Sequence, residues 1–120
     1  MKKKNSLELK ELENKTILIT GAKGMLGLAF SEMLKEYAPS ARVFSFGKDE
    51  LDVTKKSQIV ECFNINPDYI IHCAALVNAD YCEDHKDEAY DVIVKGTINL
   101  IELAKSCNAK ILYPQSFLIY

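Results

Sequence analysis

The chain has 120 residues, of which 48% are hydrophobic and 27% are charged, and its formal net charge is −2. This length suits one domain with a modest core, and the composition is ordinary for a soluble globular protein. The near-neutral charge argues against a nucleic-acid or membrane-surface role, and no apolar run approaches the roughly 20 residues that span a bilayer.

The first segment, residues 1–15, reads "MKKKNSLELKELENK". It is basic at its start and then charged throughout, and it lacks the continuous apolar stretch of a secretory signal peptide. We interpret it as a short solvated or helical extension. We therefore expect a cytoplasmic protein whose folded domain occupies residues 16–120.

The first predicted elements are a strand, a helix and a second strand. The β-branched apolar run Thr16–Thr20 predicts a buried parallel strand. A helix follows the glycines and ends near Pro39, and its apolar face comprises Leu26, Ala29, Phe30, Met33, Leu34 and Tyr37. Arg42–Phe46, "RVFSF", predicts the second strand.

The middle of the chain predicts a short extended piece at "ELDVT", residues 50–54, followed by a helix. We expect Thr54 to cap that helix, which would continue to about Phe63. The turn signal "NPD", residues 66–68, then precedes a strand over Tyr69–Cys73.

The last part predicts a long amphipathic helix from about Lys86 to Cys107 and a strand over Lys110–Tyr113. Strands and helices thus alternate along the whole chain, which predicts an α/β fold with a doubly wound parallel sheet.

Three glycines, Gly21, Gly24 and Gly27, follow the first strand and open the first helix. In such a strand–turn–helix unit the first glycine permits the tight turn. The second lets the backbone approach a pyrophosphate, and the third lets the helix pack against the strand. The pyrophosphate lies at the helix N-terminus, where free N–H groups favour negative charge. The spacing G-x-x-G-x-x-G in this context predicts a dinucleotide site, and the alternative is a glycine-rich turn that binds nothing.

The four cysteines, Cys62, Cys73, Cys82 and Cys107, form no C-x-x-C pair. Cys82 and His85 have a spacing that metal sites use, but the chain offers too few further ligands nearby for a closed zinc site. We expect free thiols that are buried or half-buried, and no metal.

Four ordered segments resemble the extended short-chain dehydrogenases/reductases, and more narrowly their dTDP-4-dehydrorhamnose reductase branch. The segments are "TGAKGMLG", "DELDVTKKSQI", "NPDYIIHCAALVNADYCE" and "AYDVIVKGTINLIELAKSCNAKILYPQS". The resemblance extends over residues 16–120. It implies an NAD(P)-binding Rossmann fold and an oxidoreductase that acts on a nucleotide-linked 4-keto-6-deoxy sugar.

The resemblance also implies roles for individual residues. Asp52 and Val53 would lie beside the adenine, although without the resemblance we would favour a capping or turn carboxylate for Asp52. Ser116 would help to polarise the substrate carbonyl. The pyrophosphate loop would comprise Gly21, Ala22, Lys23, Gly24, Met25, Leu26 and Gly27, and the cofactor cleft would be lined by Cys73, Ala74 and Ala75.

The choice between NAD(H) and NADP(H) depends on the residues after the second strand. NAD sites usually carry an acidic residue about 20 positions after the glycines, which binds the ribose hydroxyls. Here Gly47 and Lys48 follow the strand, and Lys48 could meet a 2′-phosphate, although Asp49 and Glu50 come next. We favour NADP(H), with a solvated loop lysine as the alternative for Lys48.

Two departures from the family pattern bear on activity. The long helix has Ile93 where the family places an asparagine of the proton relay, while Gly96, Thr97 and Asn99 match. The family's catalytic Tyr-x-x-x-Lys pair lies downstream of the residue that matches Ser116, and the sequence ends before it. We therefore expect a fragment of a longer enzyme, inactive alone, with open sheet edges that favour marginal stability or self-association.

Three readings remain open at this point. One is the cofactor-binding part of a reductase, or of a related epimerase or dehydratase. Another is a non-catalytic NAD(P)-binding regulatory protein on the same fold, as in the regulatory subunit of methionine adenosyltransferase, which would agree with Ile93. The last is an α/β domain that binds no nucleotide. A Tyr-x-x-x-Lys pair in the full gene would favour the first reading.

Overall fold

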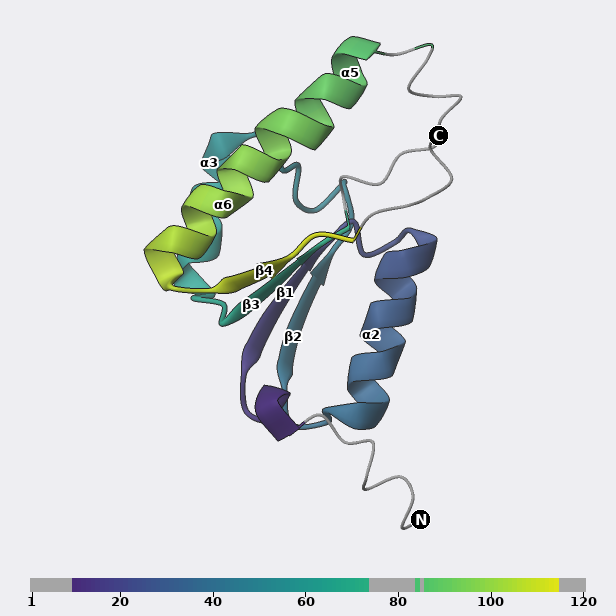
Figure 1. Ribbon diagram of the computed structural model, residues 1–120, viewed down its shortest axis with the longest axis vertical. Helices are drawn as coiled ribbons and strands as arrows, with labels where there is room; N and C mark the ends of the chain where they lie inside the picture. The colour runs from purple at the N-terminus through teal and green to yellow at the C-terminus, as the bar shows by residue number, and fades with distance from the viewer. Residues whose placement is uncertain (1–9, 74–83, 85, 115–120) are drawn as a thin grey trace.

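The computed structural model describes residues 10–73, 84 and 86–114. In this part of the chain, four parallel strands form one sheet in the order β2-β1-β3-β4 (Figure 1). The strands are β1 (Thr16–Thr20), β2 (Arg42–Phe46), β3 (Tyr69–His72) and β4 (Lys110–Leu112). The structure confirms the expected α/β class with a parallel sheet.

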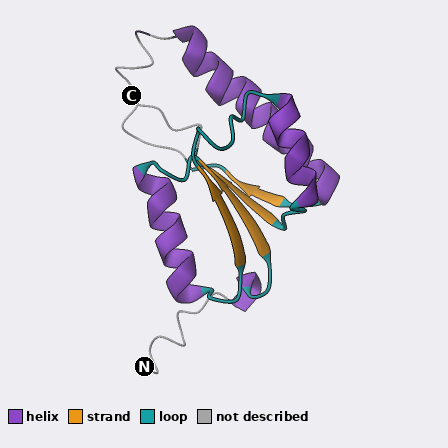
Figure 2. Cartoon of the chain, turned by 180° about the vertical axis from the view of Figure 1, so that it is seen from behind, coloured by secondary structure: helices purple, strands orange, loops and turns teal. Residues whose placement is uncertain are grey.

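Helices cover both faces of the sheet, as a doubly wound fold requires (Figure 2). Helix α2 (Met25–Tyr37) lies on one face. Helices α3 (Lys56–Glu61) and α6 (Gly96–Cys107) lie on the other. Short 3-10 turns at Lys10–Leu12 and Cys62–Asn64 complete the described elements before the long helix.

The strand β1 divides the core into two layers because successive side chains of a strand point to opposite faces. Leu18 packs with Leu100 and Leu103 of α6. Its neighbours Ile17 and Ile19 pack with Leu34 of α2. All five residues of β1 are buried, which explains why this strand reads as a continuous apolar run.

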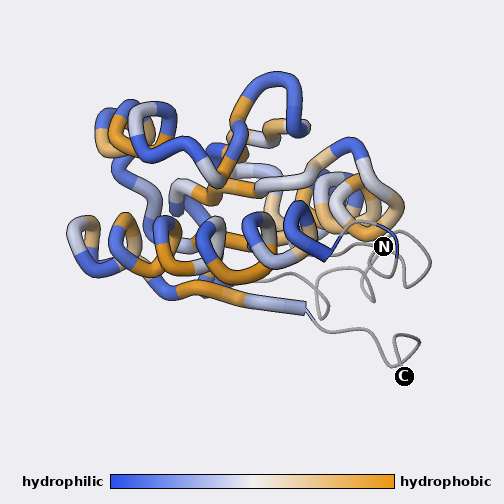
Figure 3. The backbone as a smooth tube through the Cα atoms, turned by 90° about the horizontal axis from the view of Figure 1, so that it is seen from above, coloured by the Kyte–Doolittle hydropathy of each residue, from blue (hydrophilic) through white to orange (hydrophobic). Residues whose placement is uncertain are grey.

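Helix α6 is amphipathic, and hydrophilic and hydrophobic colours alternate along the long helix in Figure 3. The apolar side chains of α6 that face the sheet recur at helical spacing, as Leu100, Leu103 and Ala104 do. Within the described residues, no helix has the length and apolar character that crossing a membrane requires.

The long helix expected over residues 86–107 is present, but its middle departs from α geometry. Helix α5 (Lys86–Tyr90) leads into a π-helical segment, Asp91–Lys95, which continues as α6 (Figure 1). The ion pair between Lys95 Nζ and Asp91 Oδ1, 3.4 Å apart, lies along this segment. A π-helical turn is a local change in hydrogen bonding that a hydrophobic pattern does not reveal.

Two expectations for the middle of the chain were wrong. Residues 50–54 form no strand, and residues 50, 53 and 54 lie in turns. Thr54 does not cap α3, which begins at Lys56 after the N-cap residue Lys55. The reason is that the Thr54 hydroxyl instead donates a hydrogen bond to Asp52 Oδ1 at 2.7 Å.

The remaining boundaries differ from expectation by small amounts. The third and fourth strands each end one residue earlier than predicted, at His72 and Leu112. The predicted helix ending near Phe63 is α3 followed by the 3-10 turn Cys62–Asn64. Strands β1 and β2 have the predicted bounds, and α2 ends two residues before Pro39.

Candidate functional site

The candidate site lies at the carboxyl ends of three neighbouring strands. In the sheet register, Thr20 at the end of β1 stands opposite both Phe46 of β2 and His72 of β3. The loops that follow these residues therefore leave the sheet at the same edge. In open α/β sheets this edge, where the strand order reverses, is where ligands bind.

The glycine loop has the backbone conformation that its sequence predicts. Gly21 has φ of 63°, a left-handed conformation that favours glycine. The loop turns back on itself through a hydrogen bond from Gly24 N to Gly21 O at 3.2 Å. It is also tied to the end of β2, because Ala22 N donates to Phe46 O at 3.0 Å.

Gly27 is required for close packing of the helix on this loop. A Cβ at Gly27 would collide with the carbonyl oxygen of Gly21 and would lie 2.7 Å from the Cα of Ala22. Helix α2 therefore approaches the loop backbone more closely than any side chain allows. This is the packing role expected for the third glycine.

Gly24 has a different environment, and it fits a site for an anion. A Cβ there would meet only Gly21 O within 4 Å, at 3.5 Å, so the position is otherwise open. Gly24 is also the N-cap residue of α2, and it provides no side-chain hydrogen bond to the first turn. An open backbone surface at the start of a 13-residue helix is suited to receive a phosphate group.

The other predicted loop residues differ in how far their side chains are exposed to solvent. The Ala22 side chain is buried in the core beside α2, so only its backbone is available to a ligand. Lys23, Met25 and Leu26 are exposed, and Met25 is 90% exposed. Their side chains therefore point away from the core at the mouth of the candidate site.

Two lysines lie near the end of β2. The Lys23 side chain passes over Gly47, where a Cβ would lie 2.7 Å from the Lys23 Cδ. Its Nζ is 4.0 Å from Asp49 Oδ2, and both side chains are largely exposed. Lys48 is also exposed in this loop. Lys48 was the residue predicted to meet a 2′-phosphate, and the packing of Lys23 across the same loop was not predicted.

The Asp52 carboxylate accepts the hydrogen bonds that close a tight turn. Its Oδ1 accepts hydrogen bonds from Thr54 N at 3.0 Å and from the Thr54 hydroxyl at 2.7 Å. The bond from the Thr54 hydroxyl is the main cause that lowers the pKa of Asp52. The structure thus shows Asp52 as the turn carboxylate that the residues alone favoured.

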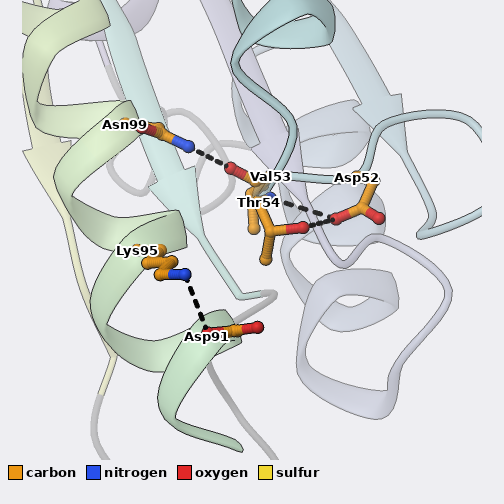
Figure 4. A network of polar contacts seen from close by, with 6 residues as sticks. All are labelled: Asp52, Val53, Thr54, Asp91, Lys95 and Asn99. Atoms are coloured by element: carbon orange, nitrogen blue, oxygen red, sulfur yellow. Dashed lines mark hydrogen bonds and ion pairs between the residues drawn. The ribbon is translucent and has the colours of Figure 1, made fainter. Parts of the chain in front are cut away.

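Val53 is held against helix α6. It is buried, and its carbonyl accepts a 2.8 Å hydrogen bond from the Asn99 side-chain amide (Figure 4). Gly96, one turn earlier on α6, lets the Val53 side chain approach, since a Cβ there would lie 2.5 Å from Val53 Cγ2. From the sequence, Gly96 and Asn99 were only matches to the family pattern.

His72 is the group at this edge that sequence reasoning missed. It is fully buried, with Nδ1 2.8 Å from the Thr20 hydroxyl and Nε2 3.2 Å from the Thr97 hydroxyl. Burial lowers its pKa to about 4, so the ring is neutral near pH 7. The ring of Tyr113 lies close by, with a centroid separation of 5.7 Å. A polar residue within the apolar run "YIIHC" was the available signal.

Cys73 is buried at the end of β3, and burial raises the pKa of its thiol. Its N–H donates to Thr20 O at 3.2 Å, which ties it to β1 at the candidate site. Ala74, Ala75 and Ser116, also expected in the site, lie outside the described residues. So do Cys82 and His85. In the part of the chain described, no three His, Cys, Asp or Glu side chains gather as metal ligands.

Comparison with protein families gives one match over most of the chain. The family described as "RmlD substrate binding domain" matches residues 15–120. A dTDP-4-dehydrorhamnose reductase from Aggregatibacter actinomycetemcomitans is 31% identical over 105 residues, which cover 87% of this chain and 35% of the relative. The chain thus spans about a third of the length of this curated relative.

Two further proteins are informative about the range of functions. The crystal structure of a dTDP-4-dehydrorhamnose reductase from Bacillus anthracis, in complex with NADP, is similar at a TM-score of 0.76 and 34% identity. The similar region covers 82% of this chain and 35% of the chain in that crystal structure. The beta subunit of methionine adenosyltransferase 2 from Bos taurus is 28% identical, covering 91% of this chain and 34% of the relative.

Proposed function

The chain belongs to the RmlD substrate binding domain family, and from this premise we propose that it is the cofactor-binding part of a reductase. The whole enzyme would use NADPH or NADH to reduce a nucleotide-linked 4-keto-6-deoxy sugar. The relatives named as dTDP-4-dehydrorhamnose reductases and the NADP complex of one of them support this assignment.

The glycine loop carries the proposal. Gly21 makes the turn, Gly27 admits the helix, and Gly24 leaves its backbone open where the pyrophosphate would bind. These features fit a dinucleotide, because each glycine has the conformation or the contact that its role demands. When bound, the cofactor supplies the hydride, and the protein supplies orientation and electrostatics.

The other residues of the site would act on different parts of the cofactor. Asp52 and Val53 would flank the adenine, and Cys73 would line the cleft beyond β3. Lys48 would bind a 2′-phosphate, with Lys23 close to the same loop. Further roles are proposed for Ala74 and Ala75 in the cleft and for Ser116 at the substrate carbonyl.

A second candidate function is a non-catalytic NAD(P)-binding regulatory protein. Ile93 in place of the asparagine of the family's proton relay favours it. So does the similarity to a subunit named as part of methionine adenosyltransferase 2, which covers 91% of this chain. The two candidates share the cofactor site. A full-length protein with a Tyr-x-x-x-Lys pair and sugar-reducing activity would favour the enzyme.

Thermal unfolding of the chain with NADPH, NADP, NADH or NAD tests the cofactor site. A ligand at 100 times its dissociation constant adds roughly 2.7 kcal/mol to the free energy of unfolding. For a domain of this size that increment raises the melting temperature by several degrees. We expect such a shift with NADPH. A folded sample whose melting temperature responds to none of the four dinucleotides would contradict the proposal.

A further inference from the structure

The loop that would meet the adenine, residues 51–54, is placed mainly by side chains. It belongs to no strand, although Leu51 N donates to Gly47 O and Lys55 N donates to Asp52 O, each at 3.0 Å. The Asp52 N–H donates to the side-chain oxygen of Gln58 at 2.7 Å. Asp52 in turn holds Thr54 through its carboxylate. Such a loop depends for its position on the groups that reach it from neighbouring helices.

Asn99 is the group that reaches this loop from α6. Its side chain is buried, and its amide donates to the carbonyl of Val53, 46 residues earlier in the sequence (Figure 4). The Val53 carbonyl is part of the loop backbone, so this bond fixes the main chain as well as a side chain. Without the donor, a buried carbonyl would lose its partner, and the loop would have to move toward other donors.

The same face of α6 also determines where the Val53 side chain lies. Gly96 and Asn99 are three residues apart, which places them on one face of the helix. Gly96 leaves the space that Val53 Cγ2 fills, and Asn99 binds the carbonyl of the same residue. Val53 is therefore held at both its side chain and its backbone by one turn of α6.

We propose that Asn99 is a positioning residue of the cofactor site, which holds the Asp52–Val53 loop where the adenine half of the dinucleotide would bind. This inference rests on the proposed function, because it assumes a dinucleotide in the site. It assigns Asn99 no contact with the cofactor. Its consequence is that loss of the Asn99 amide weakens binding of the adenine half even in a folded protein.

The test measures binding of NADPH and of ADP, which carries the adenine half alone, by titration calorimetry on the full chain. The variants are Asn99→Asp, which keeps the shape and removes the donor, and Asn99→Leu. We expect both to bind NADPH and ADP roughly tenfold more weakly than the unsubstituted chain, at a temperature where all samples are folded.

Asp68→Ala is the matched control. Asp68 Oδ2 accepts a 2.9 Å hydrogen bond from Thr16 N, at the start of β1 and away from the candidate site. This variant also loses a side-chain bond to the backbone, so it should lower stability while leaving ADP binding unchanged. If Asn99 variants that remain folded bind ADP as tightly as the unsubstituted chain, the inference is overturned. Equal weakening by Asp68→Ala would overturn it as well.

Gly96→Ala provides a second perturbation in case the Asn99 variants do not fold. It presses on Val53 while leaving the Asn99 amide in place. Weaker ADP binding would support the control of this loop by α6, and unchanged binding would count against it. If the unsubstituted chain binds neither ADP nor NADPH, the proposed function itself fails. By contrast, if the Asn99 variants bind ADP normally, only the role of Asn99 is overturned.

Discussion

The hydroxyl of Thr20 lies 2.8 Å from Nδ1 of His72, at the carboxyl ends of two neighbouring strands. The other ring nitrogen of His72 is 3.2 Å from the Thr97 hydroxyl on α6. One buried imidazole thus connects β1, β3 and α6 directly beneath the candidate site. Because the ring is fully buried, it resists protonation, and its pKa falls to about 4.

The stability of the chain should therefore depend on pH in the window between about 6.5 and 4. In this window the unfolded chain binds a proton at His72 that the folded chain does not. The free energy of unfolding should decrease as the pH falls, by roughly 3 kcal/mol over the whole span. Urea unfolding at intervals of half a pH unit measures this slope.

The control for that measurement is His72→Asn, which removes the titrating group. The pH slope between 6.5 and 4 should become smaller than in the unsubstituted chain. Asp52, whose pKa is lowered from 3.8, affects stability mainly below this window, and its smaller contribution near pH 4 is common to both proteins. Equal slopes in the two proteins would show that His72 is not the group responsible.

Gly27→Ala should destabilise the fold. The added methyl would press on the backbone of Gly21 and Ala22. Backbone atoms cannot move aside as the end of a flexible side chain can. Overpacking of this kind costs typically 1–3 kcal/mol. We expect a loss of that size in urea unfolding, and an unchanged midpoint would argue against the close contact between α2 and the loop.

The variant Gly24→Ala distinguishes an effect on folding stability from an effect on NADPH binding. Its added methyl would meet only an ordinary 3.5 Å contact, and Gly24 has φ of −75°, which alanine adopts freely. We therefore expect little change in the urea midpoint. If the pyrophosphate binds over this position, NADPH affinity should fall in the same variant. Normal NADPH binding by Gly24→Ala would place the pyrophosphate elsewhere.

The features that the sequence predicted well are those with a local cause. Strand β1 is buried throughout because both its faces are covered, and its bounds agree with the prediction. The glycine loop was predicted because Gly21, Gly24 and Gly27 lie directly between a predicted strand and a predicted helix. Gly21 and Gly27 then show the positive φ and the close contact that this pattern implies.

The features that it did not predict depend on distant partners or on competing hydrogen bonds. The bond from Asn99 to Val53 joins residues 46 positions apart, and no periodicity indicates it. The Thr54 hydroxyl could either cap helix α3 or bind Asp52, and in the structure it binds Asp52. His72 lies in an apolar run, and its partner Thr97 is 25 positions away in the sequence, where no local pattern connects the two.

Thr54→Val should raise the pKa of Asp52. The hydrogen bond from the Thr54 hydroxyl is the largest cause of the lowered pKa, and valine keeps the shape while removing the donor. The carboxyl carbon of Asp52, followed by NMR during an acid titration, reports this pKa directly. Lys48→Ala is the control, since its charge is the weakest of the causes and should produce a smaller change. A larger effect of Lys48→Ala would reverse this order.

Lys48→Ala should reduce affinity for NADPH more than affinity for NADH. A lysine that meets the 2′-phosphate contributes a charge-assisted interaction, and its loss should weaken NADPH binding roughly tenfold. NADH lacks that phosphate, so its affinity should remain nearly constant. Titration calorimetry of both dinucleotides gives the ratio of the two dissociation constants.

Lys35→Ala is the control for the general effect of charge, because Lys35 is an exposed lysine in the last turn of α2, far from its N-terminus. Lys23→Ala tests whether the lysine that passes over Gly47 shares the phosphate with Lys48. If it does, the double variant should bind NADPH and NADH with similar affinity. If Lys48→Ala leaves the affinity ratio unchanged while Lys23→Ala alters it, Lys48 is a solvated loop residue, and Lys23 selects the cofactor.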